Sequence, residues 1–299
     1  MKINLIELDK VESLLLISEQ DLECAEILSN HKRYPNSIYL LFQSIEKTSK
    51  GLALMKGLFK FNELKDKVNH SPLRMCRLEI LNNLKEAEKL EDAVRKNPEL
   101  NEIPSIKSLD LSTFKKNAQF AEKILLSVMK KGKIFSDDIG ELDIAINEMN
   151  KMIITIKRIN IEEFNEIYFK QYKDAWTNSI MAYIKLSEEQ GKHIDETEKE
   201  QSLSISDETL KMIADNVRKD LILEGIIPAL STTLNLLLSP HFKFLRYPDS
   251  KNPLEYYTDR NPLVMRLDKL IDIQKENVLF HKEYLEILKR IYSRIIIEE

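Results

Sequence analysis

The sequence predicts an all-α protein, a helical bundle of about eight helices. Only six of the 299 residues are glycine, about 2% where globular proteins average about 7%. Leu, Ile, Lys and Glu are abundant, and three of these four residue types favour helices. A chain of this length can form one large domain or two of ordinary size, and either can fold without metals or disulfides.

The first predicted helix covers about residues 5–29. One side of it is apolar, at Leu15, Leu22, Ala25 and Leu28, with Ile17, Cys24 and Ile27 widening the stripe. Asn30 and Pro35 should end this helix, because Asn is a good helix stop and Pro disfavours helical geometry at Tyr34. A second helix follows, with one apolar face made of Ile38, Leu41, Phe42, Ile45 and Leu52. Two helices joined by so short a turn should pack antiparallel.

The remaining helices are placed by periodicity and by capping residues. Ser71 and Pro72 form a helix start, and Asp137 or Asp138 can cap a later helix. A further helix starts at Ser206 and should kink or divide at Pro228. Four prolines between Pro240 and Pro262 predict the longest irregular region. The other helices are expected near residues 72–96, 109–131, 138–159, 161–192 and 261–296.

An internal similarity suggests a domain division. A shift of 142 positions, from Tyr34 to Trp176 (176 − 34), aligns Asn178, Ser179 and Ile180 with Asn36, Ser37 and Ile38, and it also aligns Glu188 with Glu46 and Lys192 with Lys50. A duplication would give two related bundles, at residues 1–135 and 136–299. The alternative is that a shared helical period produces the matches.

Composition and charge exclude several classes of function. The net charge of −4, from 45 basic and 49 acidic residues, gives no global positive field, so a nucleic-acid contact would need a local patch. The first ten residues lack the apolar core of a signal peptide, and residues 221–238 contain Glu224 and Pro228, which favours a core helix over a membrane span. We therefore expect a cytoplasmic protein with no membrane contact.

No metal or cofactor is expected. Cys24 and Cys76 lack CxxC spacing and are predicted to be buried, reduced thiols. His193, Asp195 and Glu198 lie in a polar run that has no second group of ligands. The sequence contains no Gly-rich phosphate loop, nucleophile elbow or HExxH pattern.

Two groups of residues carry candidate chemistry. Glu46 and Lys50 have the spacing of a surface ion pair. The sharper hypothesis is an anion-binding surface made of Arg33, Tyr34, Lys47 and Lys50, with the tyrosine as a stacking face.

The second group contains histidines. His70 is either a helix-entry residue or a proton donor and acceptor near neutral pH. His241 and Arg246 interrupt an apolar approach to a turn, where they either anchor a loop or act in catalysis.

The chain resembles HEPN domains, helical modules of prokaryotic toxin–antitoxin and phage-defence systems. The resemblance rests on Asp21, Leu22 and Ala25, on the second helix with Tyr34, Gln43, Glu46, Lys47 and Lys50, and on His70. The segment 176–192, which ends in SEEQGK, is similar to a helix of AbiV-type abortive-infection proteins, and RYPD at 246–249 is similar to a turn of HEPN proteins.

The resemblance implies a homodimer through helices of the N-terminal region and, in ribonuclease members, an Arg that precedes a His by a few residues on one helix. None of the five histidines here has that Arg upstream. His241 and Arg246 have the spacing in reversed order, and His70 with Arg74 is the other candidate pair.

Three hypotheses about function remain open. The first is an HEPN-like binding or regulatory protein in phage defence that engages RNA, a nucleotide or a protein partner. The second is a metal-independent endoribonuclease, in which a His moves protons and an Arg stabilises charge on the phosphate. The third is a helical interaction scaffold with no ligand. Convergence of Arg33, Lys47, Lys50 and Arg246 in space would favour the first hypothesis, and scatter would favour the scaffold.

Overall fold

The chain folds into helices throughout the part that the structure describes. The structure is a computed structural model that describes residues 5–68, 71–98, 110–131, 135–161, 166–189, 191, 195–197, 199, 204, 206–246 and 252–297. Within these ranges there is no strand, and eight helices are seven residues or longer, so the all-α prediction is confirmed.

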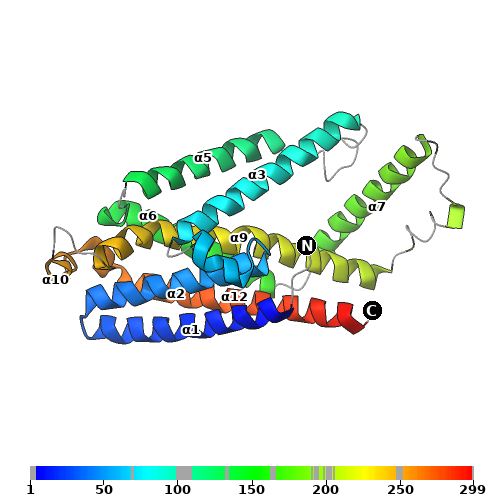
Figure 1. Cartoon of the computed structure of the whole chain (residues 1–299). Helices are drawn as coiled ribbons and strands as arrows, with labels where there is room; N and C mark the ends of the chain where they lie inside the picture. The colour runs from blue at the N-terminus through cyan, green and yellow to red at the C-terminus, as the bar shows by residue number, and fades with distance from the viewer. Residues whose placement is uncertain are drawn as a thin grey trace. The chain divides into compact units, whose positions relative to one another are not determined.

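The helices are drawn in Figure 1. The eight long ones are α1 (Leu5–Asn30), α2 (Tyr34–Met55), α3 (Pro72–Lys96), α5 (Leu111–Lys131), α6 (Ile139–Ile161), α7 (Glu166–Glu189), α9 (Asp207–Arg246) and α12 (Leu267–Ile297). The short ones are η1 (Phe61–Glu63), η2 (Leu64–Val68), η4 (Phe135–Asp137), α10 (Pro253–Tyr256) and α11 (Pro262–Met265). No helix in these described ranges has both the length and the apolar composition to cross a bilayer.

The chain forms two compact units. Unit 1 contains Met1–Glu79, Glu122–Ile156 and Leu223–Glu299, and unit 2 contains Ile80–Ala121 and Lys157–Ile222. Both units draw segments from each side of residue 135, and the division into domains 1–135 and 136–299 stays a prediction.

The turn between α1 and α2 ends the first helix where the sequence predicts. Arg33 N–H donates to the Leu28 carbonyl at 2.8 Å, and Lys32 N–H donates to the Ser29 carbonyl at 2.8 Å. Lys32 has φ +55°, the left-handed conformation that this type of helix end requires. Pro35 lies in the first turn of α2, where its missing N–H costs no helical hydrogen bond. The turn therefore reverses the chain within three residues.

The buried side of α1 is a narrow seam. Its residues follow one another at alternating steps of three and four: Leu8, Val11, Leu15, Ser18, Leu22, Ala25 and Ser29. This is the heptad spacing of coiled coils, in which only two positions in seven face the partner helices. The wider apolar stripe predicted for α1 is wrong, because Ile17 and Ile27 are about half exposed and Cys24 is exposed on the outward side of the helix.

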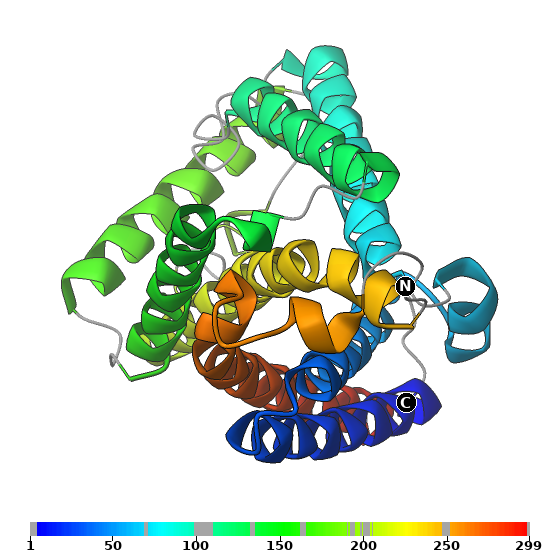
Figure 2. The same ribbon diagram turned by 90° about the vertical axis from the view of Figure 1, so that its left-hand side faces the viewer.

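Helices α1, α2 and α12 pack side by side in unit 1 (Figures 1 and 2). Ser37 Oγ donates to the Ala25 carbonyl at 2.6 Å, and Ser18 Oγ donates to the Ser44 carbonyl at 2.9 Å, so α1 and α2 run antiparallel as predicted. The seam of α12 repeats the steps of three and four, at Leu267, Leu270, Gln274, Asn277, His281, Tyr284 and Leu288.

A ladder of ion pairs joins the flanks of α1 and α12. Its three rungs are Glu12 with Lys289 at 2.9 Å, Glu26 with Lys275 at 2.6 Å, and Glu19 with Lys282 between them. The rungs are seven residues apart on each helix. Each pair is partly exposed and contributes at most about 1 kcal/mol, but the ladder shows that α1 and α12 run antiparallel in one register.

The second half of α9 completes the bundle. The ring of Phe242 stacks on Phe42 of α2 with the centroids 4.3 Å apart. Pro228 and Pro240 both lie inside α9, so the helix does not divide at Pro228, and the predicted alternative of a kink there stays a prediction. The predicted irregular region is shorter than expected, because α9 continues to Arg246 and α10 and α11 follow. Buried apolar residues of α9 face the bundle: Ile227, Leu230, Leu234, Leu237 and Leu238.

Unit 2 contains most of α3, the first part of α5, the last turn of α6, the whole of α7 and the first part of α9. Lys115 pairs with Glu91 at 2.5 Å, and Lys173 pairs with Asp207 at 2.6 Å. Trp176 is the eleventh residue of α7, whereas Tyr34, aligned with it by the internal similarity, begins α2. The aligned Lys192 lies outside the described residues.

Candidate functional site

The predicted anion-binding surface begins at the turn before α2. Arg33 is exposed there, and Tyr34 donates its hydroxyl hydrogen bond to the Asp259 carboxylate. That hydrogen bond raises the pKa of Tyr34 to about 12, with a smaller contribution from desolvation. Lys32 lies 3.9 Å from the same carboxylate. The turn is therefore already occupied by an acidic side chain from the segment after α10.

Lys47 and Lys50 do not join Arg33. They lie 14 and 17 residues further along α2, which places them about 21 and 26 Å away along the helix axis. Lys47 forms an ion pair with Asp21, and Lys50 forms one with Glu46 at 2.5 Å. Both lysines are mostly buried, and neither presents an unpaired charge to an anion. The predicted cations are thus separated along the helix, and two are neutralised.

His241 is buried inside unit 1, and Arg246 is exposed at the end of α9. The Arg246 guanidinium carbon lies 5.9 Å from the centroid of the Phe242 ring. His241 Nδ1 lies 2.7 Å from the Tyr257 hydroxyl, and Nε2 lies 2.5 Å from Ser136 Oγ. Both ring nitrogens therefore have protein partners.

Ser136 Oγ also lies 3.1 Å from the Leu237 carbonyl, which accepts from it. The Ser136 and Tyr257 hydroxyls can each donate or accept, so both ring nitrogens are satisfied in a neutral imidazole. Burial lowers the pKa of His241 to about 4, which keeps the ring neutral at pH 7. The geometry is that of a tie between α9, η4 and the segment after α10; a catalytic role for His241 stays a prediction.

Of the other predicted catalytic pair, His70 and Arg74, the structure describes only Arg74. His70 lies outside the described residues. Arg74 is exposed in the first turn of α3, which begins at Pro72 as predicted. The pair stays a prediction.

A cluster of buried polar side chains crosses the core of the bundle, and we call it the polar layer. Gln274 Nε2 donates to Ser44 Oγ at 3.0 Å and to Thr48 Oγ1 at 3.3 Å. Asn277 Nδ2 donates to Gln274 Oε1 at 2.9 Å, and Asn277 Oδ1 accepts from Ser231 Oγ at 3.2 Å. The layer comprises Ser18, Ser44, Thr48, Ser231, Asn235, Gln274 and Asn277, all at most 2% exposed.

The polar layer links all four helices of the bundle. Ser18 of α1 lies 2.8 Å from Ser44 of α2 through their hydroxyls. Asn235 Nδ2 of α9 donates to Ser49 Oγ of α2 and to the Ser231 carbonyl, both at 2.8 Å. Asn235 Oδ1 is buried and has no hydrogen-bond partner among the described residues. Most donors and acceptors of the layer are satisfied, so it directs packing through hydrogen bonds.

His281 extends this arrangement by one turn of α12. Its Nδ1 lies 2.6 Å from the Asn277 carbonyl, and because a carbonyl only accepts, Nδ1 carries the hydrogen. Nε2 is buried and finds no partner in the described part of the chain. Burial lowers the pKa of His281 to about 4, so the ring is neutral at pH 7.

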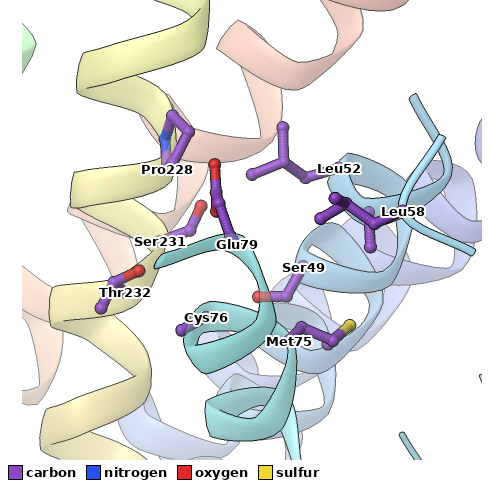
Figure 3. A pocket seen from close by; sticks show the side chains of 10 residues that line it. Ser49, Leu52, Leu58, Met75, Cys76, Glu79, Pro228, Ser231 and Thr232 are labelled. Atoms are coloured by element: carbon purple, nitrogen blue, oxygen red, sulfur yellow. The ribbon is translucent and has the colours of Figure 1, made fainter. Parts of the chain in front are cut away.

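A small pocket lies beside the polar layer (Figure 3). Its volume of about 20 Å³ has room for about one water molecule. Ser49 of α2, Cys76 and Glu79 of α3, and Ser231 and Thr232 of α9 line it with polar atoms. Glu79 pairs with Lys56 at the end of α2. The other lining residues are Leu52, Ala53, Leu58, Met75 and Pro228.

Cys76 is buried as predicted, and Cys24 is not. Burial raises the pKa of the Cys76 thiol to about 12, against a smaller opposing effect of its hydrogen bond with Thr232. A thiol held protonated is a poor nucleophile and a poor metal ligand. Within the described ranges, no three His, Cys, Asp or Glu side chains gather in a way that could hold a metal ion.

Sequence reasoning missed the polar layer. A signal was present in the steps of three and four that join Gln274, Asn277 and His281 on one face of a predicted amphipathic helix. Polar residues at core spacing are rare enough to deserve a search for partners. Ser44 and Thr48 show the same spacing on α2, but no local pattern pairs two helices 230 residues apart.

Comparisons with known proteins identify no relative of this chain. Searches against protein-family models, curated proteins and solved structures each find no significant match. The site is therefore described by its geometry alone.

Proposed function

We propose that the chain is a helical, HEPN-like binding protein that acts by contact with a protein partner and not by catalysis. One observation carries the proposal: among the described residues, several of the side chains predicted for anion binding or proton transfer are engaged in contacts within the fold. Lys47 and Lys50 are held by carboxylates, and His241 has both ring nitrogens in hydrogen bonds.

The choice of a protein partner over RNA follows from charge. A nucleic-acid interface needs clustered Lys or Arg side chains that neutralise phosphates and release their condensed counterions. Here the net charge is −4, Arg33 lies about 21 Å or more along α2 from Lys47 and Lys50, and both lysines are paired with carboxylates. These cations therefore favour a protein partner over RNA.

The resemblance to HEPN modules supports a place in prokaryotic phage defence and a homodimer through the N-terminal helices. The residues of α1 and α2 that carry the resemblance join these two helices: Asp21 pairs with Lys47, and the Ala25 carbonyl accepts a hydrogen bond from Ser37. The resemblance thus supports the fold more directly than it supports an activity.

The alternative is a metal-independent endoribonuclease, and the exposure of Arg74 at the start of α3 favours it. An assay with a mixed RNA pool in excess chelator separates the two functions. We expect no cleavage by the wild-type chain and no gel shift that depends on Lys47 and Lys50. Cleavage that His70→Ala or Arg74→Ala abolishes, with the fold retained by circular dichroism, would replace the proposal with the ribonuclease.

A further inference from the structure

The bundle of unit 1 has two kinds of helix contact that repeat every seven residues. The buried seam of α1 repeats in heptads from Leu8 to Ser29, and the seam of α12 does so from Leu267 to Leu288. The ladder of ion pairs has the same period, with rungs at Glu12, Glu19 and Glu26. A periodic interface can be satisfied in more than one register.

A shift of α12 along α1 by one heptad would be an alternative register of this kind. The helix would move by about 10.5 Å. Glu12 would then face Lys282 and Glu19 would face Lys275, so two of the three rungs would be formed again. Seam residues would again face seam residues. Neither contact by itself distinguishes the observed register strongly from the displaced one.

The polar layer does not repeat in this way. Gln274 finds Ser44 and Thr48 opposite it, and Asn277 finds Ser231. One heptad away on α12 the seam carries Leu267 on one side and His281 on the other. After displacement, Gln274 and Asn277 would lose these partners in the core, and a buried unpaired amide costs about 1–3 kcal/mol.

We infer that the polar layer is a register lock: it selects one of several nearly equivalent alignments of α12 in the bundle. A single polar residue in a coiled-coil seam is known to select register at a cost in stability. Replacement of buried polar groups by apolar ones of similar size is often neutral or stabilising, so the contribution of the layer is to specificity.

A competing anchor exists at the start of α12. Arg266 makes a bidentate pair with Asp143, at 2.6 and 2.8 Å. This pair is partly exposed, and it holds one end of the helix from the surface. The experiment must therefore distinguish a lock in the core from a clamp at the end.

Engineered disulfides report the register directly. In a Cys24→Ser background, Glu19→Cys with Lys282→Cys reports the observed register. Glu12→Cys or Glu26→Cys, each with Lys282→Cys, report displacement by one heptad in either direction. In the observed register these two pairs are offset by about 10.5 Å along the helices, beyond the reach of a disulfide.

The three pairs are compared in the wild-type core and in a core that carries Gln274→Leu and Asn277→Leu. The remaining hydroxyls can bond carbonyls of their own helices, as Thr48 already does with the Ile45 carbonyl at 3.0 Å. With the wild-type core we expect only the Glu19→Cys pair to cross-link. With the apolar core we expect at least one displaced pair to cross-link to a similar extent, with helicity and melting temperature retained.

Two results would overturn the inference. Displaced pairs that stay silent in the folded apolar core would show that contacts at the start of α12, Arg266 with Asp143 or Ser29 with Asp268, hold the register. Loss of the fold in the apolar core and also in the milder single variant Gln274→Met would show that the layer is needed for stability, contrary to a role in specificity.

Discussion

The neutral, buried His281 makes stability depend on pH in a way that the structure quantifies. Its pKa is about 4 in the folded chain and about 6.5 in the unfolded chain, because burial penalises the charged ring. Between these two pKa values, His281 is protonated in the unfolded chain and neutral in the folded chain. The stability that His281 contributes is therefore complete above about pH 6.5 and is lost as the pH falls toward 4.

The perturbation is His281→Leu, which removes the titrating ring and keeps a core side chain of similar size. Linkage gives a loss of about 2.5 kcal/mol for wild-type His281 between about pH 7 and pH 4.5. The variant should lack this loss, so its free energy of unfolding should fall by about 2.5 kcal/mol less over the same range. At pH 7 the two proteins should differ by less than about 1.5 kcal/mol.

The assay is urea unfolding followed by circular dichroism at several pH values, with His31→Gln as the matched control. His31 is exposed in the turn after α1, so its substitution removes a histidine without disturbing the core. Parallel pH profiles for wild type and His281→Leu, with equal urea dependence of the unfolding free energy, would refute the reasoning. They would mean that His281 is hydrated or charged in the native state.

Three further predictions concern packing and reactivity. Lys282→Glu should cost less than about 1 kcal/mol of unfolding free energy, and adding Glu19→Lys should recover it at low salt but not at high salt, because the rung is partly exposed. Gly51→Ala should raise the melting temperature by stabilising α2 by about 0.5–1 kcal/mol, since a Cβ there would meet Val11 Cγ1 at an ordinary 3.5 Å; a lower melting temperature would show that α1 sits closer. A thiol reagent should modify one cysteine per native chain, Cys24, and mass spectrometry that finds Cys76 modified without denaturant would contradict its burial.

Helix positions could be predicted because their signals are local. Pro72 begins α3 and Asn30 ends α1, since a proline in the first turn and a good stop residue act within a few residues of themselves. Pro228 and Pro240 misled for the same reason, because the sequence shows only their local effect. Each removes one helical hydrogen bond, and that local cost is outweighed by the buried leucines of α9 that lie between the two prolines.

The site could not be predicted because it depends on pairing. Lys47 looks like an available cation until Asp21 of another helix neutralises it. His241 looks accessible until Ser136 and Tyr257 enclose it. Cys24 looked buried because apolar neighbours widened the stripe, whereas heptad packing buries only the seam of α1. Such contacts join residues far apart in the sequence and leave no local trace.

Helix α12 covers the shared seam of α1 and α2, although it follows them by a long stretch of sequence. Helices α1 and α2 leave the ribosome before α12. The start of α12 at Leu267 lies 212 residues after the end of α2 at Met55 (267 − 55). At about 5–20 residues per second the hairpin waits about 10–40 seconds for its partner. Ser18, Ser44 and Thr48 lie in the middle of the seam that α12 covers, so water can hydrogen-bond there until α12 arrives. We expect these hydroxyls to make the nascent hairpin less prone to aggregate than an all-apolar seam would be.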